Sequence, residues 1–287
     1  MDARDPVDAA QSARDGERHR RRMRRLAITG GVITAVLAIV VGGFAYLWAH
    51  SGGRPVSLEE ARRRFLEQQV GDLGTAGTYR PAEGVYSYSG SGSESLSSPP
   101  KSQDEGPEMP GTVSHADGGC WTFRLDYSTN HWRVWKFCAD ADGLREVGTS
   151  VYQRWDFVVS SVDNLTEMHC KPPAVVIESG MQPGDAWESE CRGTSSQISG
   201  TTISTGTHRF VGRDGVEVAG RTIDALHFRE ERAVSGAQSG TEVFDLWLTD
   251  QGLPIQGRQR IVVDSDSPIG RVTYTQEGAF VLVSALP

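Results

Sequence analysis

The chain has 287 residues, a formal net charge of −8 and a mean hydropathy of −0.38. Beyond position 25 it holds 21 basic and 32 acidic residues. This excess of negative charge argues against nucleic acid as a partner.

Residues 1–25 combine eight arginines with five acidic residues and show no apolar periodicity. A segment of this composition cannot bury enough apolar surface to fold alone. We therefore predict a disordered, basic cytoplasmic tail.

An uncharged apolar run occupies residues 26–49. At 1.5 Å per helical residue the run reaches about 36 Å, more than the roughly 30 Å of a bilayer's hydrocarbon core. A cleavable signal peptide has a shorter apolar region and a small-residue cleavage site, whereas Tyr46, Leu47 and Trp48 continue this run. We predict an uncleaved transmembrane helix and keep a cleaved signal as the alternative.

Six arginines lie between positions 18 and 25, and basic residues beside a span stay in the cytoplasm. We therefore predict a single-pass protein of the cell membrane, with its N-terminus cytoplasmic and residues 50–287 extracytoplasmic. Arg62, Arg63 and Arg64 reduce the charge contrast across the span.

Small residues recur every four positions in the predicted span, at Thr34, Ala38 and Gly42. Such a stripe lets two membrane helices approach closely, which would give a helix-mediated homodimer. Single spans also carry small residues without pairing, so we favour a stripe that faces lipid and keep the dimer as the alternative.

Residues 50–80 are predicted to form a juxtamembrane linker with one helix. Ser57 and Glu60 have the spacing of a capping box, which predicts a helix from about residue 58 to 70. Ala61, Phe65 and Leu66 give this helix an apolar stripe. The stripe suits a docking surface for an envelope protein partner, but we favour a short stalk or a lid on the domain.

Residues 81–287 are predicted to form a mainly β extracytoplasmic domain, a curved antiparallel sheet of half-barrel type with few helices. Short alternating runs are separated by turn residues such as Asp214-Gly215 and Asp250-Gln251-Gly252. Residues 98–119 contain four prolines and few apolar side chains, which predicts a mobile loop. The predicted strands cover residues 84–97, 120–127, 131–139, 144–160, 164–170, 184–192, 198–212, 220–233, 241–249, 254–264, 268–276 and 279–285.

Residues 120–127 and 131–138 have the pattern of a β-hairpin centred on Thr129. Positions whose numbers sum to 258 then face each other, so that Cys120 lies opposite Cys138. The same register sorts four aromatic side chains onto one face of the hairpin and leaves Thr122, Arg124 and Lys136 with the cysteines on the other. The four are Trp121, Phe123, Trp135 and Phe137.

All four cysteines follow the predicted span, and an even number in an oxidising compartment indicates two disulfides. The hairpin register favours the pair Cys120–Cys138 among the three pairings that four cysteines allow. Cys170 then pairs with Cys191, whose flanking residues also look extended. A zinc site is disfavoured because the chain contains no C-x-x-C.

Residues 208–287 run through a strand with a V-x-G motif, a long hairpin, the D-L-W-L strand, the G-L-P turn and closing strands. In this succession the segment resembles the last half of LolA/LppX-like envelope proteins. The resemblance implies a strongly curved half-barrel with helices on its concave side, which several family members use to carry lipid or lipoprotein acyl chains. Family carriers are commonly soluble or lipid-anchored, whereas this chain has a predicted span and one predicted ectodomain helix.

A large curved sheet lined with aromatic side chains can hold an apolar ligand such as a lipid or an acyl chain. Aromatic residues also fill ordinary cores, and the sequence leaves these two alternatives open. A second functional hypothesis is a non-enzymatic protein-interaction module of a cell-envelope complex. The ligand-binding residues that we predict are Trp121, Phe123, Trp135, Phe137 and Trp247.

Standard catalytic motifs are missing from the sequence, including G-x-S-x-G, H-E-x-x-H and the P-loop. The histidines beyond the predicted span are scattered singly, and we interpret His131, beside the hairpin turn, as a solvated or stacking residue rather than a base. We predict no enzymatic activity, no cofactor and no metal site.

Overall fold

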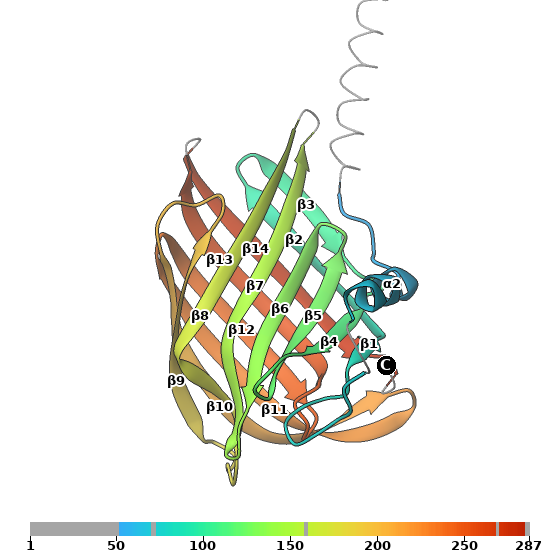
Figure 1. Cartoon of the computed structure of the whole chain (residues 1–287). Coiled ribbons are helices and arrows are strands. Elements are labelled where there is room, and N and C mark those ends of the chain that lie inside the picture. The colour runs from blue at the N-terminus through green and yellow to red at the C-terminus, as the bar shows by residue number, and fades with distance from the viewer. Residues whose placement is uncertain (1–51, 70–72, 158–159, 268–269, 285–287) are drawn as a thin grey trace, which may run out of the picture. The chain divides into compact units, whose positions relative to one another are not determined.

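The computed structural model describes residues 52–69, 73–157, 160–267 and 270–284 (Figure 1). The predicted tail and the predicted span, residues 1–25 and 26–49, lie outside this part of the chain. Within it, no helix is both long enough and apolar enough to cross a membrane. The chain divides into two compact units, and the larger one, residues 52–156 and 160–287, is called the β unit below.

Fourteen strands of the β unit form one sheet, in the order β1-β4-β5-β6-β7-β8-β9-β10-β11-β12-β13-β14-β2-β3. Neighbours along the chain are therefore neighbours in the sheet from β4 to β14, as expected for consecutive antiparallel hairpins. The strand bounds are β1 Gly84–Tyr86, β2 Tyr88–Ser97, β3 Pro100–Glu105, β4 Gly111–His115, β5 Cys120–Ser128, β6 His131–Ala139, β7 Gly143–Phe157, β8 Ser160–Glu178, β9 Ala186–Ser195, β10 Thr202–Val218, β11 Arg221–Gly236, β12 Gln238–Leu248, β13 Pro254–Ser267 and β14 Gly270–Leu282.

The sheet curls because residues 106–110 join its two ends. The segment connects β3 to β4, and it is hydrogen-bonded on both sides. The Gly90 N–H of β2 donates to the Pro107 carbonyl at 3.0 Å, and the Asp126 N–H of β5 donates to the Pro110 carbonyl at 3.1 Å. In Figure 1, strands β4–β8 consequently lie in front of β11–β14 in a curled half-barrel. We call the region where β2 and β3 meet β5 and β6 the seam.

Helix α2, Leu58–Gln68, begins where the capping box predicts. The Glu60 N–H donates to the Ser57 side-chain oxygen at 3.2 Å. Ala61 and Phe65 are buried in a small cluster with residues of β1 and of the preceding turn, whereas Leu66 is 65% exposed. The helix therefore packs on the β unit through a narrower stripe than the sequence predicts.

Residues 98–119 contain β3 and β4 rather than a continuous mobile loop. The strand β3 was not recognised because its inward-facing side chains, Lys101, Gln103 and Glu105, are polar although they are buried. A pattern of period two exists there, but it is a pattern of burial and not of hydrophobicity.

The predicted turn at Asp214-Gly215 is also wrong, because β10 continues through these residues and pairs with β11. The hairpin turns instead at Ala219 and Gly220, whose φ angles are +51° and +74°. Two consecutive positive φ angles are typical of a tight hairpin turn, and glycine adopts them without steric cost. The turn at residues 250–252 is confirmed, with Gly252 at φ +87°.

The predicted hairpin register is confirmed. Cys120 lies opposite Cys138 across β5 and β6, and the chain carries the two disulfides Cys120–Cys138 and Cys170–Cys191. The second disulfide joins β8 to β9, where Cys170 and Cys191 are paired in the sheet.

The disulfides close loops with sequence separations of 18 and 21 residues. Chain entropy alone gives each about 3 kcal/mol of unfolding free energy. We expect the variants C120S/C138S and C170S/C191S each to melt at a lower temperature than the wild type. Dithiothreitol should lower the melting temperature of the wild type and have no such effect on a variant without any cysteine. Both pairings would be contradicted if dithiothreitol changed neither the melting temperature nor the thiol count of the wild type.

Candidate binding site inside the curled sheet

The predicted aromatic face of the hairpin points into the β unit. Trp121, Phe123, Trp135 and Phe137 are all buried, while the residues that alternate with them are partly exposed. Trp121 and Phe137 lie with ring centroids 4.6 Å apart, and Phe123 and Trp135 are stacked at 5.7 Å. The pairs follow from the register, because directly opposed side chains share one face of the sheet.

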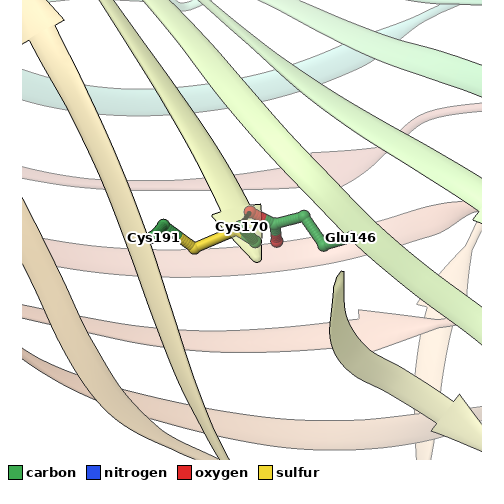
Figure 2. A group of neighbouring side chains, drawn as sticks. All are labelled: Glu146, Cys170 and Cys191. Carbon is green, nitrogen blue, oxygen red and sulfur yellow. Dashed lines mark hydrogen bonds between the residues drawn. A yellow bond between two sulfur atoms is a disulfide. The ribbon is translucent and has the colours of Figure 1, made fainter. Parts of the chain in front are cut away.

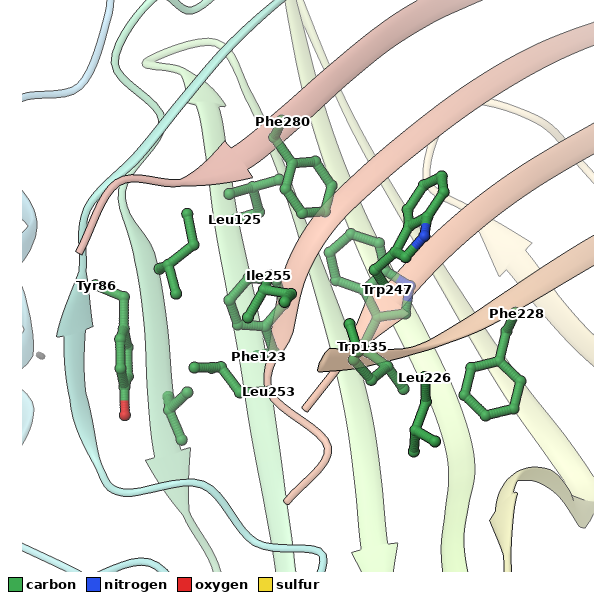
Figure 3. Packing of buried hydrophobic residues seen from close by; sticks show 14 of the residues in the cluster. Tyr86, Phe123, Leu125, Trp135, Leu226, Phe228, Trp247, Leu253, Ile255 and Phe280 are labelled. Carbon is green, nitrogen blue, oxygen red and sulfur yellow. The ribbon is translucent and has the colours of Figure 1, made fainter. Parts of the chain in front are cut away.

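Rings from the other layer of the sheet meet this face. Tyr88 of β2 lies 5.7 Å from Phe123, and Phe280 of β14 lies edge-on to Tyr88 at the same separation. Gly111 makes room for these rings, since a Cβ there would come within 2.4 Å of Tyr88. Figure 3 shows Phe123, Phe280 and Trp135 within one apolar cluster that includes Leu226 and Ile255.

Trp247 also belongs to the buried cluster, but its ring has a different environment. It stacks on His227 with centroids 4.1 Å apart, and its indole N–H donates to Asp214 at 2.9 Å. The five predicted ligand-binding residues therefore lie in one cluster, and two of them, Trp135 and Phe137, line the hollow described next.

A small hollow lies inside the sheet, with side chains from both layers around it. Its free volume is about 30 Å³, room for roughly two or three water molecules and much less than an acyl chain needs. The interior is therefore filled by its own rings rather than open as a ready-made cavity. The apolar side chains that line the hollow are Trp135, Phe137, Val176, Phe228, Phe244, Leu246 and Phe280, and the polar ones include Glu146, His208, Glu230 and Gln259.

A buried polar cluster, which the sequence analysis missed, occupies the seam. It brings together Glu94 of β2, Glu105 of β3 and His131 of β6. His131, interpreted from the sequence as solvated or stacking, is 0% exposed. Its ring contacts that of Tyr127 in a tilted arrangement, with centroids 4.6 Å apart and an interplanar angle of 35°. The sequence gives no local signal for this cluster, because residues 101–105 of β3 are polar on both faces of the strand.

The electrostatics of this cluster follow from burial and from the short distances. Burial raises the pKa of Glu94, although hydrogen bonds and the charge of His131 oppose the rise. Burial by itself lowers the pKa of His131, but the Glu94 and Glu105 carboxylates outweigh it and raise the pKa overall. The protonation state of each of these groups therefore depends on the charges of the others.

A second polar group lies beside the Cys170–Cys191 disulfide (Figure 2). Glu146 Oε1 is 3.9 Å from Cys170 Sγ, and the Arg232 guanidinium lies 3.2 Å from Cys191 Sγ. The two sulfur atoms are bonded to each other, so they are not available as thiolate ligands for a metal. Burial raises the pKa of Glu146 to about 8, and the neighbouring Glu230 carboxylate contributes to the rise.

Fold and interior together define a class of protein: a curled antiparallel half-barrel with rings at its centre and buried ionisable groups at its seam. No protein-family model matches the chain, and no curated protein matches it. A solved structure that does match is that of the hypothetical lipoprotein YmcC from Escherichia coli (K12), with 12% identity and a TM-score of 0.32 over 80% of this chain and 98% of that one. The resemblance of residues 208–287 to LolA/LppX-like proteins stays a prediction.

Glu146 should make the stability of the β unit fall as the pH rises. Its pKa is about 8 in the folded protein, against an ordinary value of 4.5, so the folded state holds a proton between these values that the unfolded state has lost. Stability from this group is complete below about pH 4.5 and is lost as the pH approaches 8. Glu146→Gln, which mimics the protonated carboxyl, should flatten the decline in melting temperature over this range.

The control is Glu277→Gln, which removes an exposed carboxylate on β14. The charges that act on Glu146 are Glu230, Arg232, Glu242 and Arg133, and all of them stay in place in both variants. Equal pH profiles for wild type and Glu146→Gln would contradict the assignment.

Proposed function

We propose that the β unit binds an apolar chain, such as the acyl chain of a lipid, between the two layers of its sheet. We propose further that residues 26–49 anchor it in the cell membrane and present it on the extracytoplasmic side. The observation that carries the proposal is the hollow, whose lining includes seven apolar side chains contributed by both layers.

The two layers are held together differently in two parts of the interior. At the seam, polar side chains form hydrogen bonds and ion pairs across the sheet, including His131 with Glu105. Around the hollow, rings such as Phe228 and Phe280 supply most of the apolar lining. Contacts between rings are non-directional, so an acyl chain can replace them without leaving a polar group unpaired.

The free volume of about 30 Å³ sets a condition on binding, because it cannot hold an acyl chain unless side chains move. Phe280 is the side chain best placed to do so. Its ring lies over Gly257, where an added Cβ would come within 2.4 Å of it. The ring thus occupies space above bare backbone, and its displacement would open the hollow along β13.

The anchoring part of the proposal comes from the sequence. The apolar run at residues 26–49 is long enough to span a bilayer, and the arginines before it favour a cytoplasmic N-terminus. The disulfides agree with an oxidising compartment for the β unit. The proposed role is binding and not catalysis.

A pair of phenylalanine variants tests ligand binding. Phe280 and Phe65 are both 6% exposed, but Phe280 lines the hollow and Phe65 lies on the buried face of α2. Phe→Ala at either position should cost about 3–5 kcal/mol of stability through the cavity that is left. A 16-carbon fatty acid should raise the melting temperature of the full-length wild type, and raise that of Phe280→Ala more, because the ring no longer has to move.

Phe65→Ala should gain no more from the fatty acid than the wild type does. Native mass spectrometry of the purified full-length protein supplies the second readout, through co-purified lipid. A protein that carries no lipid and shows no shift with fatty acid, in the wild type and in Phe280→Ala alike, would reject the proposal. The interaction-module hypothesis would then be preferred.

A further inference from the structure

Glu94, Glu105 and His131 meet at the seam although they come from three different strands. Their side chains are fully or almost fully buried, at 1%, 4% and 0% exposure. His131 Nδ1 is 2.8 Å from Glu105 Oε1 and 3.4 Å from Glu94 Oε2. Ligand-type atoms of the three residues all lie within 4.8 Å of one another.

These separations suit a shared metal ion. Zinc binds imidazole nitrogen at about 2.0–2.1 Å and carboxylate oxygen at about 2.0–2.2 Å. Neighbouring ligand atoms around such an ion are then about 2.8–3.6 Å apart, from octahedral to tetrahedral geometry. The two distances from His131 Nδ1 fall within this interval.

Neighbouring side chains hold both carboxylates in place. The Tyr274 hydroxyl and the Gln153 side-chain amide donate to Glu94 Oε2 at 2.9 and 3.0 Å. The Gln276 amide donates to Glu105 Oε1 at 2.7 Å. Metal ligands in proteins are commonly oriented by such a second layer of hydrogen bonds.

A further observation concerns unpartnered polar atoms at the seam. Among the described residues, six buried side-chain atoms have no hydrogen-bond partner, and four of these are Glu105 Oε2, His131 Nε2, Arg133 Nε and Gln259 Nε2. Tyr127 lies beside two of these residues: its ring is tilted by 35° against the ring of His131, and its hydroxyl donates to Gln259 at 3.0 Å. Arg133 Nε and Gln259 Nε2 are donors and cannot ligate a cation, whereas Glu105 Oε2 is an acceptor to which a bound cation would supply a partner.

We propose that Glu94, Glu105 and His131 form a binding site for one divalent transition-metal ion, with zinc as the probe. The ligands are Glu94 Oε2, the two oxygens of Glu105 and His131 Nδ1, so the ion also gives Glu105 Oε2 its partner. The site connects β2 and β3 to β6 across the seam. Because no ligand residue is exposed, the ion is structural and binds as the chain folds.

The alternative occupant is a proton, with His131 as an imidazolium between two carboxylates. The other cation that acts on His131, Arg133, lies over the rings of Phe244 and Trp135, at 4.9 and 5.6 Å. The two alternatives differ in metal content, which is measured directly.

The test refolds the full-length protein with zinc chloride or with EDTA, and then measures bound metal by inductively coupled plasma mass spectrometry. We expect one zinc per chain after refolding with zinc, and a higher melting temperature than in the EDTA sample. Glu94→Gln and His131→Gln should lose the bound zinc. Tyr274→Phe keeps all three ligands and should weaken zinc binding by about 10–100-fold, as expected for loss of an orienting hydrogen bond.

His208→Gln is the matched control, because His208 is also buried but lies in the hollow with its ring stacked on Phe228. It should bind zinc like the wild type. If the wild type holds no stoichiometric metal after refolding with zinc, the proton alternative is correct. Zinc that persists in Glu94→Gln, or in Tyr274→Phe with unchanged affinity, would place the ion elsewhere and overturn the proposal. The test does not involve the acyl chain, so it is independent of the proposed function.

Discussion

The curled sheet depends on the burial of ionisable side chains at its seam. A buried carboxylate costs several kcal/mol unless it is paired, and the ion-pair partner of Glu94 and Glu105, His131, comes from a strand that is far from β2 and β3 in the order of the sheet. His131 supplies the pairing from β6, and Gln153 supplies a hydrogen bond from β7. In an open sheet these contacts cannot all form. Closure therefore pairs the ionisable groups of the polar cluster, and the polar cluster favours one closed arrangement over a slipped one.

The apolar part of the interior is organised by a different rule. Rings lie over glycines or beside one another, as Phe280 does over its cross-strand neighbour Gly257 and as Tyr88 and Phe123 do beside Gly111. Such packing fills space without directional bonds, and it leaves a hollow of only about 30 Å³. The same side chains thus serve as a core in this structure and form the lining of the proposed binding site. The sequence left open whether these rings fill a core or line a cavity. The positions of the rings decide this, and the residue types do not.

The sequence predicted the features that rest on local patterns. The cap at Ser57, the register of the hairpin from Cys120 to Cys138 and the two disulfides each follow from residues that are close along the chain. The sequence-based prediction failed where buried side chains are polar. The strand β3 buries Lys101, Gln103 and Glu105, and His131 is enclosed by residues distant in sequence. Gln103 and Glu105 have partners across the seam, and no local sequence pattern indicates a pairing that forms only after closure.

The hollow and the seam also differ in the free energy needed to separate the two layers of the sheet. Parting the rings around the hollow exposes apolar area, at about 25 cal/mol per Å², and an acyl chain that enters buries a similar area again. Parting the layers at the seam would separate His131 from Glu94 and Glu105 and leave buried charges unpaired, a loss that no apolar ligand restores. Within the proposed function, the layers therefore open at the hollow and stay joined at the seam. A metal ion bound at the seam would hold the layers together on that side without contacting the acyl chain.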